Sequence, residues 1–207
     1  MPVDRPACVE TPAKPLGLVD LIRSDFGRFT ETFRLRGQRY SKSKVFLESC
    51  LFKAGFQAVL FYRISHWLYQ RGYNHLAWFL TRLSVALTGA EIEYNAVIGP
   101  SMFIAHAVGI VVGRGTKIGA RVTLFQGVTF GVKSWHPDEI RAFPTVGDNC
   151  FFFAHATVVG AITIGNECIV GANAVVARDV PEGAMALGIP AVIHPRKGQE
   201  AILAWAA

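Results

Sequence analysis

The chain has 207 residues, a formal net charge of +6 and 51% hydrophobic residues. This length is enough for one or two domains with a buried core. The positive charge would suit a nucleic acid, an anionic membrane or an anionic cofactor, but no recognised nucleic-acid-binding module accompanies it. A phosphate-rich small molecule is therefore the most economical partner.

The first residues of the chain carry charges at Asp4, Arg5, Glu10 and Lys14 and contain no apolar run. A secretory signal peptide needs such a run. We therefore expect a disordered tail over residues 1–16 and a cytoplasmic protein.

Residues 17–89 contain few glycines and are predicted to be an α-helical region. The apolar pattern favours two amphipathic helices at roughly 45–70 and 75–88, joined by a turn at 72–74. We expect these helices to pack against the rest of the chain or against a second subunit. Binding to a membrane surface is the alternative.

Basic residues occur throughout this helical region. Lys53, Arg63, Arg71 and Arg82 interrupt its apolar residues at intervals too short to span a bilayer, so no transmembrane helix is expected. Another basic run lies within residues 34–44, and such a run is most commonly a solvated face.

Between Ile92 and Val176 an apolar residue recurs at every sixth position in three phased runs. These anchors are residues 92, 98, 104 and 110; then 112, 118, 124 and 130; then 146, 152, 158, 164, 170 and 176. Glycine directly follows seven of the fourteen anchors, although the chain contains only 20 glycines. This period fits neither a helix nor an alternating strand, and it indicates a structural repeat.

A second apolar or small side chain follows four residues after most anchors. These positions are Ala96, Met102, Val108, Thr116, Val122, Val128, Cys150, Ala156, Ile162, Cys168, Ala174 and Val180. Two inward positions in six residues predict a solenoid, a mainly β domain in the form of a parallel β-helix over 90–186, with a C-terminal tail over 187–207. Ordinary β-hairpins are the alternative, but they do not demand this phasing.

Packing fixes the inward residues of a solenoid, so reactive groups must come from its outward corners or from loops. His106 lies two residues past the anchor Ile104 and is therefore outward, and Glu91 directly precedes the first anchor. A carboxylate near an imidazole holds its tautomer and raises its basicity, which suits the deprotonation of a hydroxyl. The polar and aromatic loop insertion 132–145 is a further candidate.

A zinc site is the competing use of histidine on such a scaffold, and it would need three convergent ligands. His106, His136 and His155 are the histidines of the repeat region, and no close pair occurs among them. We therefore expect no metal.

From Lys53 to Lys197 the chain resembles the serine acetyltransferases, a branch of the left-handed β-helix hexapeptide acyltransferases. The segments that carry the resemblance are Gly55–Ala58, Tyr62–Leu68, His106–Gly113 and Gly188–Ala191. The resemblance implies a left-handed β-helix preceded by an α-helical region. It also implies a homotrimer whose active-site cleft lies between subunits, and in this family trimers can pair.

The resemblance also implies a catalytic pair. His106 falls on the general-base histidine of the family, and Glu91 falls on its carboxylate partner, usually an aspartate. Acetyl-CoA and the acceptor are then expected to bind together, and the histidine takes the hydroxyl proton as the oxygen attacks the thioester. Backbone N–H groups are expected to stabilise the oxyanion.

On the acceptor side the chain departs from the family. Ala105 stands where the family has an aspartate that grips the serine ammonium, and Ala142 and Phe143 replace an arginine and a histidine that grip its carboxylate. A further amino-acid-binding aspartate falls near Tyr40. A site that loses its pairing charges loses its preference for a zwitterion, so we predict an acceptor other than free L-serine.

The candidate acceptor contacts suit a sugar ring, a carrier-linked group or a larger hydroxylated metabolite. They are Ala105, Trp135, His136, Phe143 and His155. For Trp135 and Phe143, packing of the loop on the β-helix is the alternative.

The resemblance implies a set of contacts to acetyl-CoA, the expected co-substrate, made largely by backbone. The matching positions are Gly131, Lys133, Ala172, Ala191, Arg196 and Lys197.

We therefore predict a CoA-dependent O-acetyltransferase that acetylates a small hydroxyl acceptor by general-base catalysis. One alternative is a polysaccharide or sugar O-acetyltransferase near the membrane. A second is an authentic serine O-acetyltransferase of cysteine biosynthesis, and a third is a non-catalytic solenoid scaffold.

Overall fold

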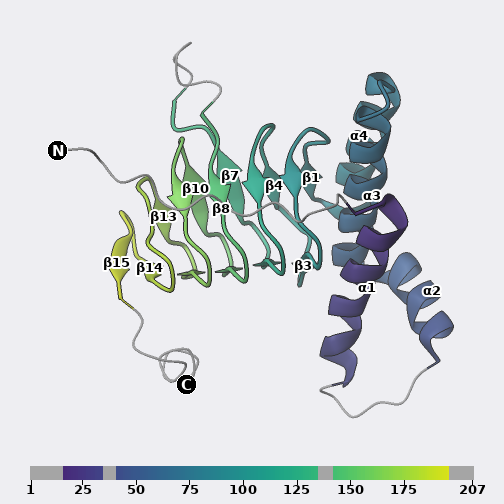
Figure 1. The fold of residues 1–207 in the computed structure, drawn as a ribbon, viewed down its shortest axis with the longest axis horizontal. Helices are drawn as coiled ribbons and strands as arrows, with labels where there is room; N and C mark the ends of the chain where they lie inside the picture. Colours follow the sequence, from purple (N-terminus) through teal and green to yellow (C-terminus); the bar gives the residue numbers. More distant parts are fainter. Residues whose placement is uncertain (1–15, 35–40, 135–141, 196–207) are drawn as a thin grey trace.

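The computed structural model of the chain describes residues 16–34, 41–134 and 142–195 (Figure 1). Its helices are α1 (Leu18–Arg34), α2 (Lys42–Phe52), α3 (Ala54–Tyr69) and α4 (Asn74–Thr88). Its strands are β1 (Glu91–Ile92), β2 (Val97–Ile98), β3 (Phe103–Ile104), β4 (Val111–Val112), β5 (Lys117–Ile118), β6 (Thr123–Leu124), β7 (Thr129–Gly131), β8 (Thr145–Val146), β9 (Phe151–Phe152), β10 (Thr157–Val159), β11 (Thr163–Ile164), β12 (Ile169–Val170), β13 (Val175–Val176), β14 (Met185–Leu187) and β15 (Val192–His194).

The strands form a parallel β-helix, as the six-residue period predicts, and its left-handed form is the one that the resemblance implies. Its three sheets run in the orders β1-β4-β7-β10-β13, β2-β5-β8-β11 and β3-β6-β9-β12-β14-β15. Each strand therefore pairs with the equivalent strand of the next coil, and all of these pairs are parallel except β14 with β15. The predicted C-terminal tail thus begins with an antiparallel strand pair rather than with irregular chain.

The core of the β-helix consists of the predicted anchors. All fourteen are buried, and the helices cover one end of the stack while β15 lies at the other (Figure 1). Cys150 and Cys168, two of the second inward positions, are buried in it, as their spacing predicts, and both are free thiols. Val108 is the exception among the second inward positions, because 70% of it is exposed.

The helical region differs from its prediction at one point. The helix expected over 45–70 is two helices, α2 and α3, which meet at an angle of 88° where Lys53 adopts an extended backbone conformation. Within the described ranges no single helix is long and apolar enough to cross a bilayer, and only α2 and α3 taken together reach that threshold.

A buried ion pair joins the helices to the first coil. Arg63 of α3 donates to both carboxylate oxygens of Asp25 on α1, at 2.8 and 3.1 Å. Two further N–H groups of Arg63 donate to the carbonyls of Ile98 and Gly99, at 2.6 Å each. Asp25 in turn accepts the backbone N–H of Met102 at 2.9 Å. The two side chains thus neutralise each other's charge and also hydrogen-bond to backbone groups at the corner between β2 and β3.

The neighbouring His66 is locked into one neutral tautomer. Its Nδ1 lies 2.8 Å from the carbonyl oxygen of Tyr94, so Nδ1 is the donor. Its Nε2 lies 2.9 Å from the amide nitrogen of Gln70 and is therefore the acceptor. Burial lowers the pKa of this imidazole, while the Tyr94 carbonyl opposes the shift and the charge of Arg63 adds to it.

Replacing Asp25 by asparagine should lower the free energy of unfolding by about 3–5 kcal/mol, because Arg63 is then buried without a counter-charge. Arg23→Gln on the same helix, where the ion pair with Asp20 is exposed, should change it by less than about 1 kcal/mol. Denaturant unfolding of both variants checks this. An Asp25→Asn protein as stable as the wild type would contradict the assigned role.

The free energy of unfolding should also fall as the pH drops below about 6.5, because the unfolded chain then binds a proton that native His66 does not. The contribution of His66 is complete above that pH and is lost as the pH falls through the lowered native pKa. Unfolding curves at several pH values should show a shallower acid dependence for His66→Gln. Equal slopes for the two proteins would rule this out.

Candidate active site

His106 lies in a corner of the β-helix that is longer than its neighbours. The anchors Ile92, Ile98 and Ile104 follow at intervals of six, but Ile104 and Val112 are eight residues apart. The two extra residues bring Ile110 into the core beside the corner. They also explain why the repeat loses its phase here and why Val108 is exposed. The sequence predicts an outward His106, and the structure places it exposed at this corner.

A cavity of about 590 Å³ opens beside this corner. His106 and Ala105 line it from the β-helix, together with Phe103 of β3. Phe29 of α1 and Phe52 at the end of α2 line it from the helices. Aromatic side chains therefore contribute to the walls from both sides, and His106 lies between the two halves of the molecule.

The start of α3 lies directly against β3. A Cβ atom built at Gly55 would overlap the carbonyl oxygen of Ile104, two residues before His106. Only glycine allows the helix to approach β3 this closely. The start of α3, which lines the cavity, is thereby held against the strand that precedes His106.

Glu91 has a partner other than the one expected. Its carboxylate forms an ion pair with Arg82 of α4, and its backbone N–H donates to the carbonyl of Ile110 at 2.8 Å. Within the described residues no hydrogen bond joins Glu91 to His106. The sequence offered no signal for Arg82, which lies nine positions before Glu91 across a helix end. The pairing of Glu91 with His106 stays a prediction.

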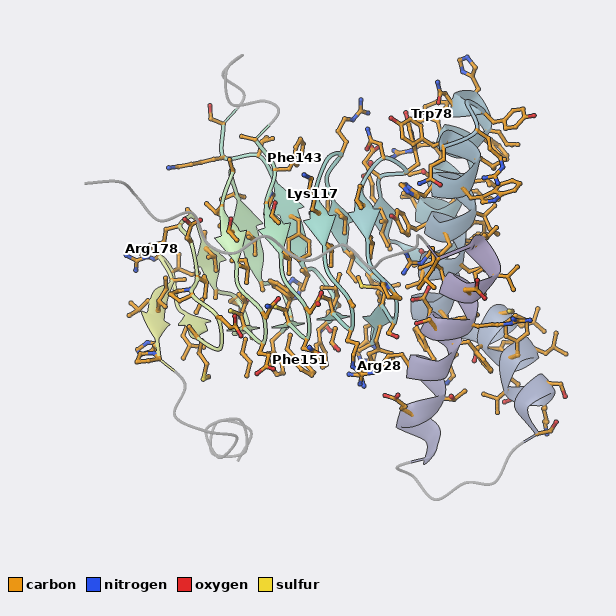
Figure 2. The ribbon with its side chains drawn as sticks, viewed as in Figure 1. Arg28, Trp78, Lys117, Phe143, Phe151 and Arg178 are labelled. Atoms are coloured by element: carbon orange, nitrogen blue, oxygen red, sulfur yellow. The ribbon has the colours of Figure 1, made fainter. Side chains whose placement is uncertain are left out.

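The structure does not bring the described acceptor candidates together at one place. Ala105 lines the cavity with His106, whereas Phe143 packs on Gly113 and Gly115 at the corner between β4 and β5. Figure 2 shows Phe143 on the same edge of the β-helix as Lys117, and Phe151, in the sheet of β3, on the opposite edge. Within one chain, Phe143 therefore has the packing role.

His155 belongs to neither of these places. It is exposed two coils beyond His106, and its ring covers Gly127. Trp135 and His136 lie outside the described residues, as do the cofactor candidates Arg196 and Lys197.

One outward ladder of the β-helix starts at His106. Strand register aligns Ile104 with Leu124, Phe152 and Val170 on successive coils. The residues two positions beyond these anchors are His106, Gln126, Ala154 and Ala172. With coils about 4.8 Å apart, this row extends roughly 14 Å along the axis. Ala172, a candidate contact to acetyl-CoA, thus lies in the same row as His106.

Sequence reasoning missed Gln126, the residue next to His106 in this row. Its side-chain oxygen is buried and accepts no hydrogen bond from the described residues. A buried acceptor without a donor is a place where a ligand N–H group gains a hydrogen bond. The sequence did hold a signal for Gln126: it follows the anchor Leu124 by two residues, as His106 follows Ile104 on the preceding coil.

The other cofactor candidates lie elsewhere on the β-helix. Gly131 ends β7, and the exposed Lys133 contacts Gly160 on the next coil. Ala191 is buried, and its carbonyl accepts a hydrogen bond from Arg178 at 2.8 Å. In the described ranges no three His, Cys, Asp or Glu side chains gather as a metal site would require.

Comparison with protein families places a bacterial transferase hexapeptide motif of six repeats at residues 143–178. The serine acetyltransferase of Mycobacterium tuberculosis is 42% identical over 136 residues, which is 66% of this chain and 58% of the relative. That of Synechococcus elongatus is 36% identical over 173 residues, which is 84% of this chain and 70% of the relative.

Solved structures of similar proteins agree with the fold. Soybean serine acetyltransferase complexed with serine has a TM-score of 0.76 and 30% identity, over 86% of this chain and 69% of that one. A serine acetyltransferase in complex with CoA has a TM-score of 0.74 and 30% identity, with the same coverage.

Gly55→Ala should lower the free energy of unfolding by about 1–3 kcal/mol, because its methyl group pushes α3 away from β3. Gly27→Ala on α1, where an added Cβ meets no atom within 4 Å, is the control. It should leave the stability unchanged or raise it by up to about 1 kcal/mol. Equal effects of the two substitutions in denaturant unfolding would contradict the close approach.

Proposed function

The chain belongs to the serine acetyltransferase family, and from this premise we propose that it transfers an acetyl group from acetyl-CoA to the hydroxyl of L-serine. The observation that carries the proposal is the position of His106, an exposed imidazole that lines the cavity between the β-helix and the helices. The complexes of similar proteins with CoA and with serine support both substrates.

In the proposed mechanism His106 is the general base. Neutral imidazole takes the proton of the acceptor hydroxyl as its oxygen attacks the thioester carbonyl carbon. The tetrahedral intermediate collapses to the acetyl ester, and the departing CoA sulfur takes the proton from the imidazolium. A base placed in this way contributes roughly 10²- to 10⁴-fold to the rate.

The names of the relatives favour serine over the acceptor predicted from the sequence. The family has charged or polar side chains at the positions of Ala105, Ala142 and Phe143, and their replacement led to the prediction that free serine is not the substrate. Yet Phe143 lies at another corner, so its replacement of histidine changes no wall of the cavity within one chain. We therefore propose serine first, the alternative that the sequence left open.

An uncharged acceptor, such as a sugar, is the second candidate. Phe125 and Phe153 stack on neighbouring coils with ring centroids 5.2 Å apart and planes 16° apart. They continue the row that Ala105 starts, since each follows its anchor directly. Aromatic faces of this kind suit a sugar ring better than a zwitterion.

The proposed assembly is a homotrimer, with acetyl-CoA between adjacent subunits along the row from His106 to Ala172. A backbone-lined cleft would explain why the side chains of this row are small beyond Gln126, at Ala154 and Ala172. Such small side chains let a pantetheine arm approach the backbone closely.

Purified protein should release CoA thiol from acetyl-CoA in the presence of L-serine, and His106→Ala should lower kcat/KM by roughly 10²- to 10⁴-fold. His75→Ala, at an exposed histidine of α4 outside the cavity lining, is the matched control and should retain the wild-type rate. Thiol release measured with and without serine checks this.

Serine-dependent release that survives His106→Ala would contradict the mechanism. Release with sugars and none with serine would favour the second candidate.

A further inference from the structure

Two strongly exposed apolar side chains line the cavity beside His106. Phe52 is 77% exposed and Val108 is 70% exposed. Phe52 belongs to the helical region and Val108 to the corner of the β-helix, so the two side chains line the cavity from its two sides. We call Phe52 and Val108 the exposed apolar pair.

Phe52 occupies a position of α2 at which a side chain is expected to be buried. Val45, Ser49 and Phe52 follow one another at spacings of four and three residues, so they share one face of the helix. Val45 and Ser49 are buried on this face. Phe52 is not, because α3 turns away by 88° directly after it and the cavity lies there. Its ring therefore lies on the packed side of α2, at the cavity.

Val108 is exposed for a different reason. It follows the anchor Ile104 by four residues, which is a buried position at most other corners, but the two extra residues of this corner turn its side chain outward. Its carbonyl still accepts the N–H of Gly127 on the next coil at 3.0 Å. The backbone of Val108 is thereby fixed, and its methyl groups are held in the cavity that His106 lines.

The cavity is large for the acceptor proposed above. Its volume of about 590 Å³ lies within the range of roughly 300–1,000 Å³ that is typical of pockets for drug-sized ligands. L-serine would leave much of it to water and would leave the exposed apolar pair wet. Exposed apolar surface in a binding cleft marks a contact for a ligand.

The proposed position of acetyl-CoA does not fill this space. The row from His106 to Ala172 runs along the β-helix away from the helices, whereas Phe52 lies at the end of α2. The space beside the exposed apolar pair is therefore left for the acceptor.

On this basis we propose that the enzyme also acetylates alcohols larger than serine, whose apolar substituent binds against Phe52 and Val108 while the hydroxyl lies at His106. The inference rests on the proposed acetyl transfer and widens the acceptor class of the same site. The reaction is unchanged: the acceptor oxygen forms the ester bond to the acetyl carbon, the thioester C–S bond breaks, and the hydroxyl proton passes through His106 to the CoA sulfur.

Serines with an acylated amino group represent this acceptor class. They keep the hydroxyl and the carboxylate of serine. Their acyl chain supplies the apolar substituent, and it replaces an ammonium for which the described lining residues offer no acidic partner.

Thiol release from saturating acetyl-CoA with N-acetyl-, N-butyryl- and N-hexanoyl-L-serine tests the inference, with L-serine measured beside them. The three acylated acceptors differ only in chain length. Their kcat/KM should rise by about two- to fourfold for each added methylene group, because each one covers further apolar surface of the cavity. N-hexanoyl-L-serine should therefore exceed N-acetyl-L-serine by at least about tenfold.

Substitutions in the exposed apolar pair should remove this gain. Phe52→Ala and Val108→Thr should each lower the ratio of kcat/KM for N-hexanoyl-L-serine to that for N-acetyl-L-serine by at least about threefold. Leu51→Ala and Val97→Thr are the matched controls, because these exposed residues do not line the cavity, and they should leave the ratio unchanged. Unfolding midpoints of all variants exclude a folding defect as the cause.

Three results would overturn the inference and leave acetyl transfer intact. The first is thiol release with L-serine but no gain from N-acetyl- to N-hexanoyl-L-serine. The second is a gain that Phe52→Ala and Val108→Thr leave unchanged. The third is a changed subunit number of these variants in sedimentation velocity with an unchanged ratio, which would assign the pair to a contact between copies of the chain. If the protein binds CoA but releases no thiol with any of the four acceptors, the proposed function fails, and the inference fails with it.

Discussion

The buried guanidinium of Arg63 is the constraint on which the rest of the structure depends. Both Arg63 and Asp25 are almost fully excluded from solvent, so their charges must be satisfied inside the protein. The partners that do this come from α1, α3 and the corner after β2, so these three must be in place together. The helices are thereby fixed on the first coil rather than tethered to it.

This docking builds the site. An isolated β-helix would expose His106 on a convex corner with nothing opposite it. With the helices in place, Gly55 touches β3, and Phe29, Phe52 and Lys53 face the base across the cavity. The proposed acceptor site is thus a property of the interface between the helices and the first coil.

The sequence predicted the β-helix well because its signal is local and repeated. Each anchor must fill the same interior position, and all fourteen are buried. The prediction failed where one corner broke the repeat: Val108 has the right residue type, but two extra residues turn it outward. The break at Lys53 was also missed, since the close approach of Gly55 to Ile104 is a tertiary contact that no periodicity records.

The candidate site was predictable only in part, for the same reason. His106 could be placed because a corner position follows directly from its anchor. Arg82 and Asp25 could not, because each pairs with a residue on another element whose location depends on the docked fold. Residue type alone did not separate an acceptor contact from packing at Phe143, and the ring packs on glycines at another corner.

A crystal structure of the protein with CoA and L-serine tests the central claim most directly. The account predicts serine in the cavity between the start of α3 and β3, with its hydroxyl within hydrogen-bond distance of the His106 imidazole. Serine bound outside this cavity, with its hydroxyl away from His106, would contradict it.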